Sequence, residues 1–196
     1  LGKLVYPLYY LDYETLMPSV PIFKNSSSYQ QIPFQFSLHV QKEIGGDVKH
    51  ISFLHKEKSD PRRALAECLV KNCGKKGSII VYNEGFEKTR NKELAELFPD
   101  LRNDILALNK RVIDQIKPFK TRALYHYKQQ GSASIKDVLP AFSNLSYNNM
   151  GIHNGSEAME QYLAFQQGNL SPEEEKNLFD NLESYCEQDT YAMVLL

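Results

Sequence analysis

The sequence has no long apolar run, and its N-terminus lacks the charged and then apolar plan of a signal peptide. No run of apolar residues approaches the ~20 that a helix needs to cross a bilayer, so we expect a soluble chain. It begins with Leu1-Gly2 in place of methionine. We therefore expect a domain excised from a longer chain, or a tag remnant at this end.

Paired cysteines are also missing. The three cysteines, Cys68, Cys73 and Cys186, are an odd number with no CxxC spacing and no histidine pair nearby. This pattern favours neither a disulfide framework nor a structural zinc site built on cysteine. We therefore expect reduced cysteines and a cytoplasmic location.

Net charge is nearly absent, but its distribution along the chain is uneven. The 23 basic and 24 acidic residues give −1, which neither indicates nor excludes a nucleic-acid partner. Residues 1–87 carry 11 basic and 9 acidic side chains (+2), residues 88–136 carry 11 and 5 (+6), and residues 137–196 carry 1 and 10 (−9). No repeat or low-complexity linker divides the 196 residues, 42% of them hydrophobic, so we expect one compact domain over residues 1–196.

Short apolar runs separated by turn residues predict a mixed α/β sheet. Strands are expected at residues 6–13, 33–40 and 48–55. The second alternates apolar and polar residues, as a half-buried strand does. Gly45-Gly46-Asp47 predicts a hairpin turn between the second strand and the third. The continuous apolar run at 78–82 predicts a strand buried on both faces. Helices are expected at residues 60–74, 86–98, 101–113, 134–139 and 171–196, with loops at 117–132 and 144–154. Three antiparallel strands followed by parallel ones, with helices on the faces, is the predicted architecture.

Two carboxylates stand two residues apart at the end of the first predicted strand. This spacing puts Asp12 and Glu14 on one face of the sheet, where like charges repel unless a cation joins them. Oxygen ligands of this kind suit Mg²⁺ or Mn²⁺. A solvated strand end carrying the same two residues is the alternative interpretation, and it is the commoner one for a lone DxE pattern.

Two further motifs carry acidic groups. Tyr185 and Asp189 are four apart in the last predicted helix and share one of its faces. Glu84 and Glu87 follow the buried strand at 78–82, and Glu87 falls in the first turn of a helix, where the helix dipole favours a carboxylate. Taken singly, helix N-capping is the favoured explanation for Glu84 and Glu87, and a tyrosine and an aspartate on an amphipathic helix are most often core edge and solvated surface.

Together, and in this order, the motifs resemble the DEDD group of 3′–5′ exonucleases. This group belongs to the ribonuclease H-like superfamily. Because its third motif contains a tyrosine, the sequence resembles the tyrosine branch of the group. The stretches YLDYET (10–15), VYNEGFEKTR (81–90), SIKDVLP (134–140) and YCEQDTYAM (185–193) look like an uncharacterised bacterial family within that group. The resemblance spans residues 9–193 and implies a ribonuclease H-like fold.

The resemblance also implies the roles of the site residues. Asp12, Glu14, Glu87 and Asp189 would be the metal-binding carboxylates, and Tyr185 would position or help deprotonate the attacking water. Two Mg²⁺ or Mn²⁺ ions about 3.5–4 Å apart would then clamp the scissile phosphate. The second motif of the group usually ends in aspartate, so Glu87 is a departure that puts metal preference and rate in doubt. Glu84 is the alternative ligand there, and Asp114 aligns loosely with an outer aspartate, although a solvated helix end explains it equally well.

Basic and aromatic residues near the motifs are candidates for contact with a nucleic acid. Lys88, Arg90 and Lys136 are the candidates for phosphate contact, with Lys136 preferred, and Phe86 is a candidate for base stacking. Further candidates are Lys92, Lys117, Lys120, Arg122, Lys128, Tyr125 and Tyr127. Exposed lysines and arginines are ordinary on helices, and His126 and His153 are expected to be surface loop residues.

The expected function is therefore a metal-dependent 3′–5′ exonuclease acting on single-stranded DNA or RNA. A silent nucleic-acid-binding or protein-docking module with the same fold is the alternative from another class. An endonuclease of the same superfamily, such as a resolvase, is a third. Fold alone does not choose among them, because one fold hosts several chemistries.

Overall fold

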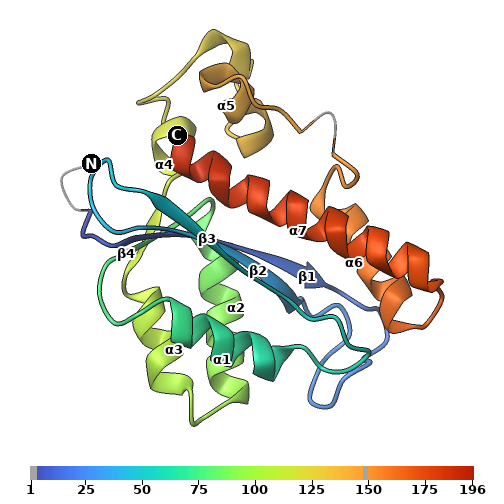
Figure 1. Cartoon of the computed structure of the whole chain (residues 1–196). Helices are drawn as coiled ribbons and strands as arrows, with labels where there is room; N and C mark the ends of the chain where they lie inside the picture. The colour runs from blue at the N-terminus through green and yellow to red at the C-terminus, as the bar shows by residue number, and fades with distance from the viewer. Residues whose placement is uncertain (1–3, 148–149) are drawn as a thin grey trace.

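The computed structural model describes residues 4–147 and 150–196, and it contains a five-stranded mixed sheet (Figure 1). The strands are β1 (Leu8–Leu16), β2 (Ile32–Gln41), β3 (Val48–Leu54), β4 (Ser78–Val81) and β5 (Val112–Asp114). Their order across the sheet is β3-β2-β1-β4-β5. The first three are antiparallel, and β4 and β5 add in parallel. The predicted mixed sheet, with an arrangement consistent with a ribonuclease H-like fold, is confirmed.

Helices cover both faces of this sheet (Figure 1). On one face lie α1 (Arg62–Asn72), α2 (Glu84–Leu97) and α3 (Arg102–Asn109). On the other lie α5 (Ile135–Phe142), α6 (Gly155–Gln166) and α7 (Pro172–Leu195). The long helix α7 contacts β1, β2 and β3. It begins as predicted, because Ser171 and Glu174 form a reciprocal capping box.

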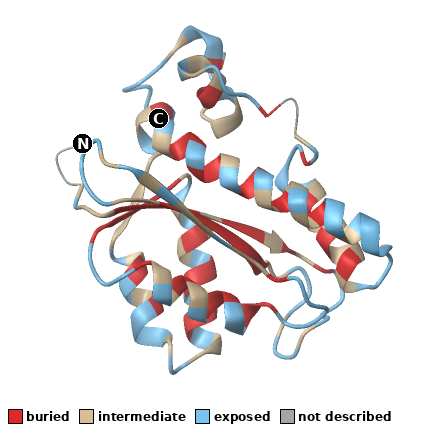
Figure 2. Ribbon diagram, in the orientation of Figure 1, coloured by how far each residue is buried: buried red, intermediate tan, exposed pale blue. Residues whose placement is uncertain are grey.

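Besides a second core under α6 and α7, an apolar core lies between the sheet and the α1–α3 face. Its members come from alternate positions of β1, β2 and β4 and from the inner faces of the helices. They include Leu11, Tyr13, Phe36, Leu38, Leu65, Leu69, Ile79, Val81, Leu94 and Ile105. In Figure 2, much of the sheet is coloured red, for buried residues, and lies between two layers of helices. The α7 helix is buried on the side that faces the sheet.

Strand β2 is buried on both faces, which corrects the half-buried strand predicted for residues 33–40. The polar residues Gln35, Ser37 and His39 are 0%, 1% and 5% exposed. They are buried because α7 covers them: the Gln35 amide donates to the Leu182 carbonyl, and the Ser37 hydroxyl meets that of Thr190.

Three elements differ from the prediction. The helix expected at 101–113 ends at Asn109, because Val112 and Ile113 pair with β4 as strand β5. Helix α6 was not predicted at all; its N-cap is Asn154, whose side chain accepts the Glu157 N–H. The loop predicted at 117–132 contains the short helix α4 (Lys117–Lys120) and the 3-10 helix η1 (Tyr127–Gln129).

In the loop expected at 144–154, residues 148–149 lie outside the described residues. The other residues of this segment form no helix or strand. Among the helices of residues 4–147 and 150–196, none has the length and apolar composition of a membrane-spanning segment.

Candidate active site

Asp12 and Glu14 project from β1 toward α7, as their spacing predicts. Asp12 pairs across the sheet with Ser37, whose hydroxyl lies 2.6 Å from that of Thr190 on α7. Tyr13, between the two acids, points the opposite way and donates its hydroxyl to Asn91 of α2 at 2.7 Å. Glu14 is buried, and the strand register shifts immediately after it.

Helix α7 brings the third motif to the same place. Asp12, Glu14, Tyr185 and Asp189 together line a cleft of about 420 Å³. The α6 residues Gly155, Ser156 and Met159 line another part of it. Residues at the two ends of the sequence therefore meet in one cleft, which is what their interpretation as one site requires.

Glu87 approaches this group from helix α2. It is 2% exposed, and its Oε2 atom has no hydrogen-bond partner among the described residues. Burial, and next the charge of Asp12, raise the pKa of Glu87 to about 9. Glu87 does not itself line the cleft. Glu87 is therefore close enough to Asp12 for their charges to interact, but it lies outside the cleft that the other three carboxylates line.

The acidic groups at the cleft raise one another's pKa. Burial and the charge of Asp189 raise the pKa of Asp12 well above its usual range, and burial and Asp12 do the same to Glu14. Burial raises the pKa of Asp189 to about 6, against the opposing effects of Tyr147 and Lys136. Each carboxylate is thus costly to ionise without a cation close by.

The donor set fits a hard divalent ion. The carboxylates supply oxygen ligands, and the unpartnered Oε2 of Glu87 is a buried acceptor that a cation would satisfy. Cys186 lies among them, with its sulfur and one carboxylate oxygen each of Asp12 and Glu14 within 4.8 Å of one another. Burial and the charges of Asp12 and Glu14 raise the pKa of the Cys186 thiol well above its usual range, so it stays protonated when no metal is bound.

Two tyrosines and a lysine surround Asp189. The Tyr147 hydroxyl donates to Asp189 Oδ1 at 2.6 Å. The Lys136 ammonium lies 5.5 Å from the Tyr147 ring centroid and 5.4 Å from that of Tyr185, and it also donates to the His153 carbonyl. Its charge lowers the pKa of both Glu14 and Asp189. Burial and Asp189 raise the pKa of Tyr185, so its phenol keeps its proton.

Of the residues predicted to contact a nucleic acid, the structure brings Phe86 and Lys136 to the site. Phe86 lines the cleft, whereas Lys88 and Arg90 do not. Lys88 forms an ion pair with Glu84 at 2.5 Å. Arg90 pairs with Glu93 at 2.8 Å, donates to Gln31, and holds its guanidinium 5.2 Å from the Phe86 ring centroid. Arg90 is thus arranged to position Phe86.

The remaining residues considered as ligands or site residues in the sequence lie outside the cleft. Glu84, the alternative ligand, is held by Lys88 and Lys117. Asp114 ends β5, and its Oδ1 accepts the backbone N–H groups of Asn83 and Ile116 at 3.0 and 3.1 Å. It therefore fixes the turn before Glu87. His126 caps the 3-10 helix, and His153 pairs with Glu157 at 3.1 Å.

Sequence reasoning missed Tyr147 and Cys186. Tyr147 stands in a segment read as a loop, and nothing local in the sequence ties it to an aspartate 42 positions later. Cys186 lies inside the third motif, next to Tyr185, and that adjacency was the available signal.

Comparisons with known proteins identify one family and two uncharacterised relatives, and none of these names an activity. A protein-family model described as "Domain of unknown function (DUF2779)" matches residues 9–134. The "Uncharacterized protein MG366" of Mycoplasma genitalium is 28% identical over 94% of this chain, and the "Uncharacterized protein MG366 homolog" of Mycoplasma pneumoniae is 26% identical over 95%. The chain spans 30% and 31% of these relatives, about a third of their length. No solved structure gives a significant match.

Proposed function

This chain belongs to the DUF2779 family, and from that premise we propose that it is a metal-dependent 3′–5′ exonuclease of single-stranded DNA or RNA. The proposal assigns it to the tyrosine branch of the DEDD group in the ribonuclease H-like superfamily. One observation carries it: Asp12, Glu14, Tyr185 and Asp189, from both ends of the sequence, line a single cleft. Glu87 lies beside Asp12, where the resemblance requires the fourth carboxylate.

Asp12, Glu14, Glu87 and Asp189 would hold Mg²⁺ or Mn²⁺. When bound, such ions neutralise the phosphate and lower the pKa of the attacking water. Without a cation the mutual repulsion of these groups, visible in the raised pKa of Glu14, would also repel a phosphodiester. A strict requirement for a divalent ion follows.

Tyr185 serves as an orienting group in this proposal. Its raised pKa keeps the phenol protonated, so it holds water by hydrogen bonding and does not take up the proton. Lys136, beside both Tyr185 and Asp189, is placed to attract a phosphate oxygen. Phe86, in the same cleft, offers a ring face on which a terminal base can stack.

The test uses 5′-labelled single-stranded DNA and RNA oligonucleotides with Mg²⁺ or Mn²⁺. We expect a ladder shortened from the 3′ end, release of mononucleotides, and no cleavage in EDTA. Asp12→Asn is expected to be inactive. Glu183→Gln is the control, because Glu183 lies on α7, the helix that carries Asp189, but pairs with Lys56. Absence of degradation with either metal, or equal activity of Asp12→Asn, would contradict the proposal.

A covalently closed single strand separates this activity from an endonuclease. An exonuclease leaves the circle intact, whereas a resolvase-like enzyme cuts it. The second candidate function, a silent binding or docking module, is favoured by one observation: Glu87 replaces the usual aspartate and does not line the cleft. Such a module would bind the oligonucleotide in EDTA and leave it uncut after metal is added.

A further inference from the structure

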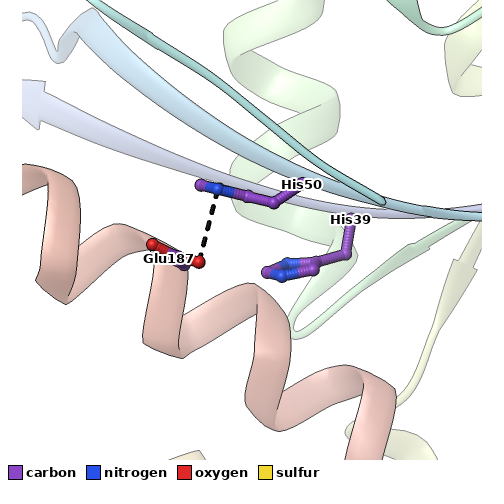
Figure 3. A group of neighbouring side chains, drawn as sticks. All are labelled: His39, His50 and Glu187. Atoms are coloured by element: carbon purple, nitrogen blue, oxygen red, sulfur yellow. Dashed lines mark ion pairs between the residues drawn. The ribbon is translucent and has the colours of Figure 1, made fainter. Parts of the chain in front are cut away.

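A second group of metal-ligating side chains lies between α7 and the β2–β3 edge of the sheet (Figure 3). His39 on β2 pairs across the strands with His50 on β3, and their rings stack with centroids 4.6 Å apart. Glu187 reaches them from α7, with its Oε1 3.4 Å from His50 Nδ1. A ring nitrogen from each histidine and a Glu187 oxygen all lie within 4.8 Å of one another.

Two hydroxyl groups fix which nitrogens face the centre of this group. The His39 Nδ1 atom lies 2.8 Å from Thr190 Oγ1, and His50 Nε2 lies 2.9 Å from Ser37 Oγ. The two hydroxyl oxygens are 2.6 Å apart, and Thr190 has the Glu187 carbonyl as an acceptor at 3.1 Å. If each ring donates to its hydroxyl, Ser37 donates to Thr190 and Thr190 to that carbonyl, so every donor has an acceptor.

With this assignment of protons, His39 Nε2 and His50 Nδ1 carry no hydrogen, and each has a free lone pair near the Glu187 carboxylate. Three electron-rich atoms at such short range repel unless a cation or a proton lies between them. A ring whose second nitrogen is held by a hydroxyl is the usual setting of a metal-binding histidine.

We propose that His39, His50 and Glu187 bind one Zn²⁺-type divalent transition metal, at a site distinct from the carboxylate cleft. Tetrahedral Zn²⁺ with bonds of about 2.0–2.1 Å keeps its ligand atoms about 3.3 Å apart, close to the 3.4 Å between His50 and Glu187. The Glu187 side chain is 51% exposed, so it is free to adjust and the site is open to entry of the ion. Two imidazoles select against Mg²⁺, which prefers oxygen ligands.

Such an ion would tie two strands to α7, the helix that carries Tyr185 and Asp189. Metal bound only by the folded chain stabilises that fold, so Zn²⁺ should raise the unfolding temperature. The proposal does not depend on nuclease activity, because neither histidine lines the cleft.

The test is a Zn²⁺ titration of the chelator-treated chain without a polyhistidine tag. An Asp12→Asn/Glu14→Gln background removes competition from the carboxylate cleft. Affinity is measured against a chromophoric chelator, and Co²⁺ is added separately to record the visible absorption of a tetrahedral nitrogen-containing site. His50→Gln removes a half-buried ligand, and Glu187→Gln removes an exposed one. Glu183→Gln, on the same helix as Glu187, is the matched control.

We expect one Zn²⁺ per chain, unaffected by millimolar Mg²⁺. His50→Gln and Glu187→Gln should each weaken binding at least ~10-fold, while Glu183→Gln leaves it unchanged. Metal-free unfolding temperatures of the variants, compared with the parent, establish that they fold. Absence of saturable Zn²⁺ binding, or equal affinity in folded His50→Gln, would overturn the proposal, whatever the nuclease assay gives.

Discussion

On strand β2, Phe36 and Leu38 belong to the core against α1–α3, whereas Ser37 and His39 contact α7. The two faces of one sheet are thus both buried, but they differ in the polar groups that they bury. The α1–α3 face holds a continuous apolar core. The α7 face has apolar clusters of its own, which include Phe34, Leu182 and Met193, and beside them it holds acids, imidazoles and hydroxyls, including carboxylates of the cleft.

The contrast separates stability from chemistry. Burial of apolar side chains stabilises the fold, whereas burial of like-charged carboxylates opposes it. The raised pKa of Asp12 and Glu14 records that opposition. We infer that apolar packing on both faces supplies the stability that lets the α7 face also hold groups suited to binding cations.

The largest expected effect comes from the α7 face. Asp12→Asn removes one charge from the carboxylate group at nearly constant volume, so activity should fall by ~10³-fold, the order reached when a key electrostatic group is lost. The free energy of unfolding in EDTA should rise, because the like-charge repulsion of Asp189 is relieved. Oligonucleotide kinetics and urea unfolding measure both. Residual activity within tenfold of wild type, or a less stable variant, would break the comparison.

A core substitution on the α1–α3 face should have the opposite signature. Leu38→Ala creates a cavity at a fully buried position and should lower the free energy of unfolding by ~2–5 kcal/mol. The neighbouring Ser37→Ala, on the α7 face, should cost only about 1 kcal/mol through its lost hydroxyl contacts. Activity of folded Leu38→Ala should stay near wild type. Equal costs for the two neighbours would contradict the division of roles.

The pH dependence of stability tests Glu87. Its folded pKa of about 9 lies above the ordinary 4.5, so the native state holds a proton that the unfolded state has lost at intermediate pH. The contribution of this bound proton to the free energy of unfolding is complete below about pH 4.5 and is lost as pH rises through about 9. In EDTA, wild type should therefore lose stability relative to Glu87→Gln by roughly 4 kcal/mol between pH 5 and pH 8. Urea unfolding across this range gives the two slopes; equal slopes would exclude a protonated Glu87.

The smallest effect is expected at Tyr147. Its hydroxyl bond lowers the pKa of Asp189, so Tyr147→Phe should raise that pKa and let protons compete with metal. Mn²⁺ affinity at neutral pH should fall by ~10-fold, typical for an outer-shell partner. Calorimetric titration measures it, with Tyr127→Phe, which is 74% exposed, as the matched control. An unchanged affinity would leave Tyr147 a packing residue only.

Local patterns were sufficient for much of this fold. Aromatic and aliphatic composition predicted β1, alternation predicted β2, and the glycine turn at 45–47 predicted β3. The apolar run predicted β4, and the Ser171 capping box predicted the start of α7. They failed at β5, whose three residues are a strand only because β4 is beside them. Helix α6, whose Asn154 cap was present in the sequence, shows that a readable signal was also overlooked.

The site divides in the same way. The sequence by itself determined that Asp12 and Glu14 share a face and that Tyr185 and Asp189 share another, because strand and helix periods are local properties. Only the tertiary structure decided that these faces meet in one cleft, that Tyr147 binds Asp189, and that Glu187 reaches His39 and His50. Those contacts join positions far apart in the chain, and which of them form depends on how α7 packs across the sheet, which no local spacing encodes.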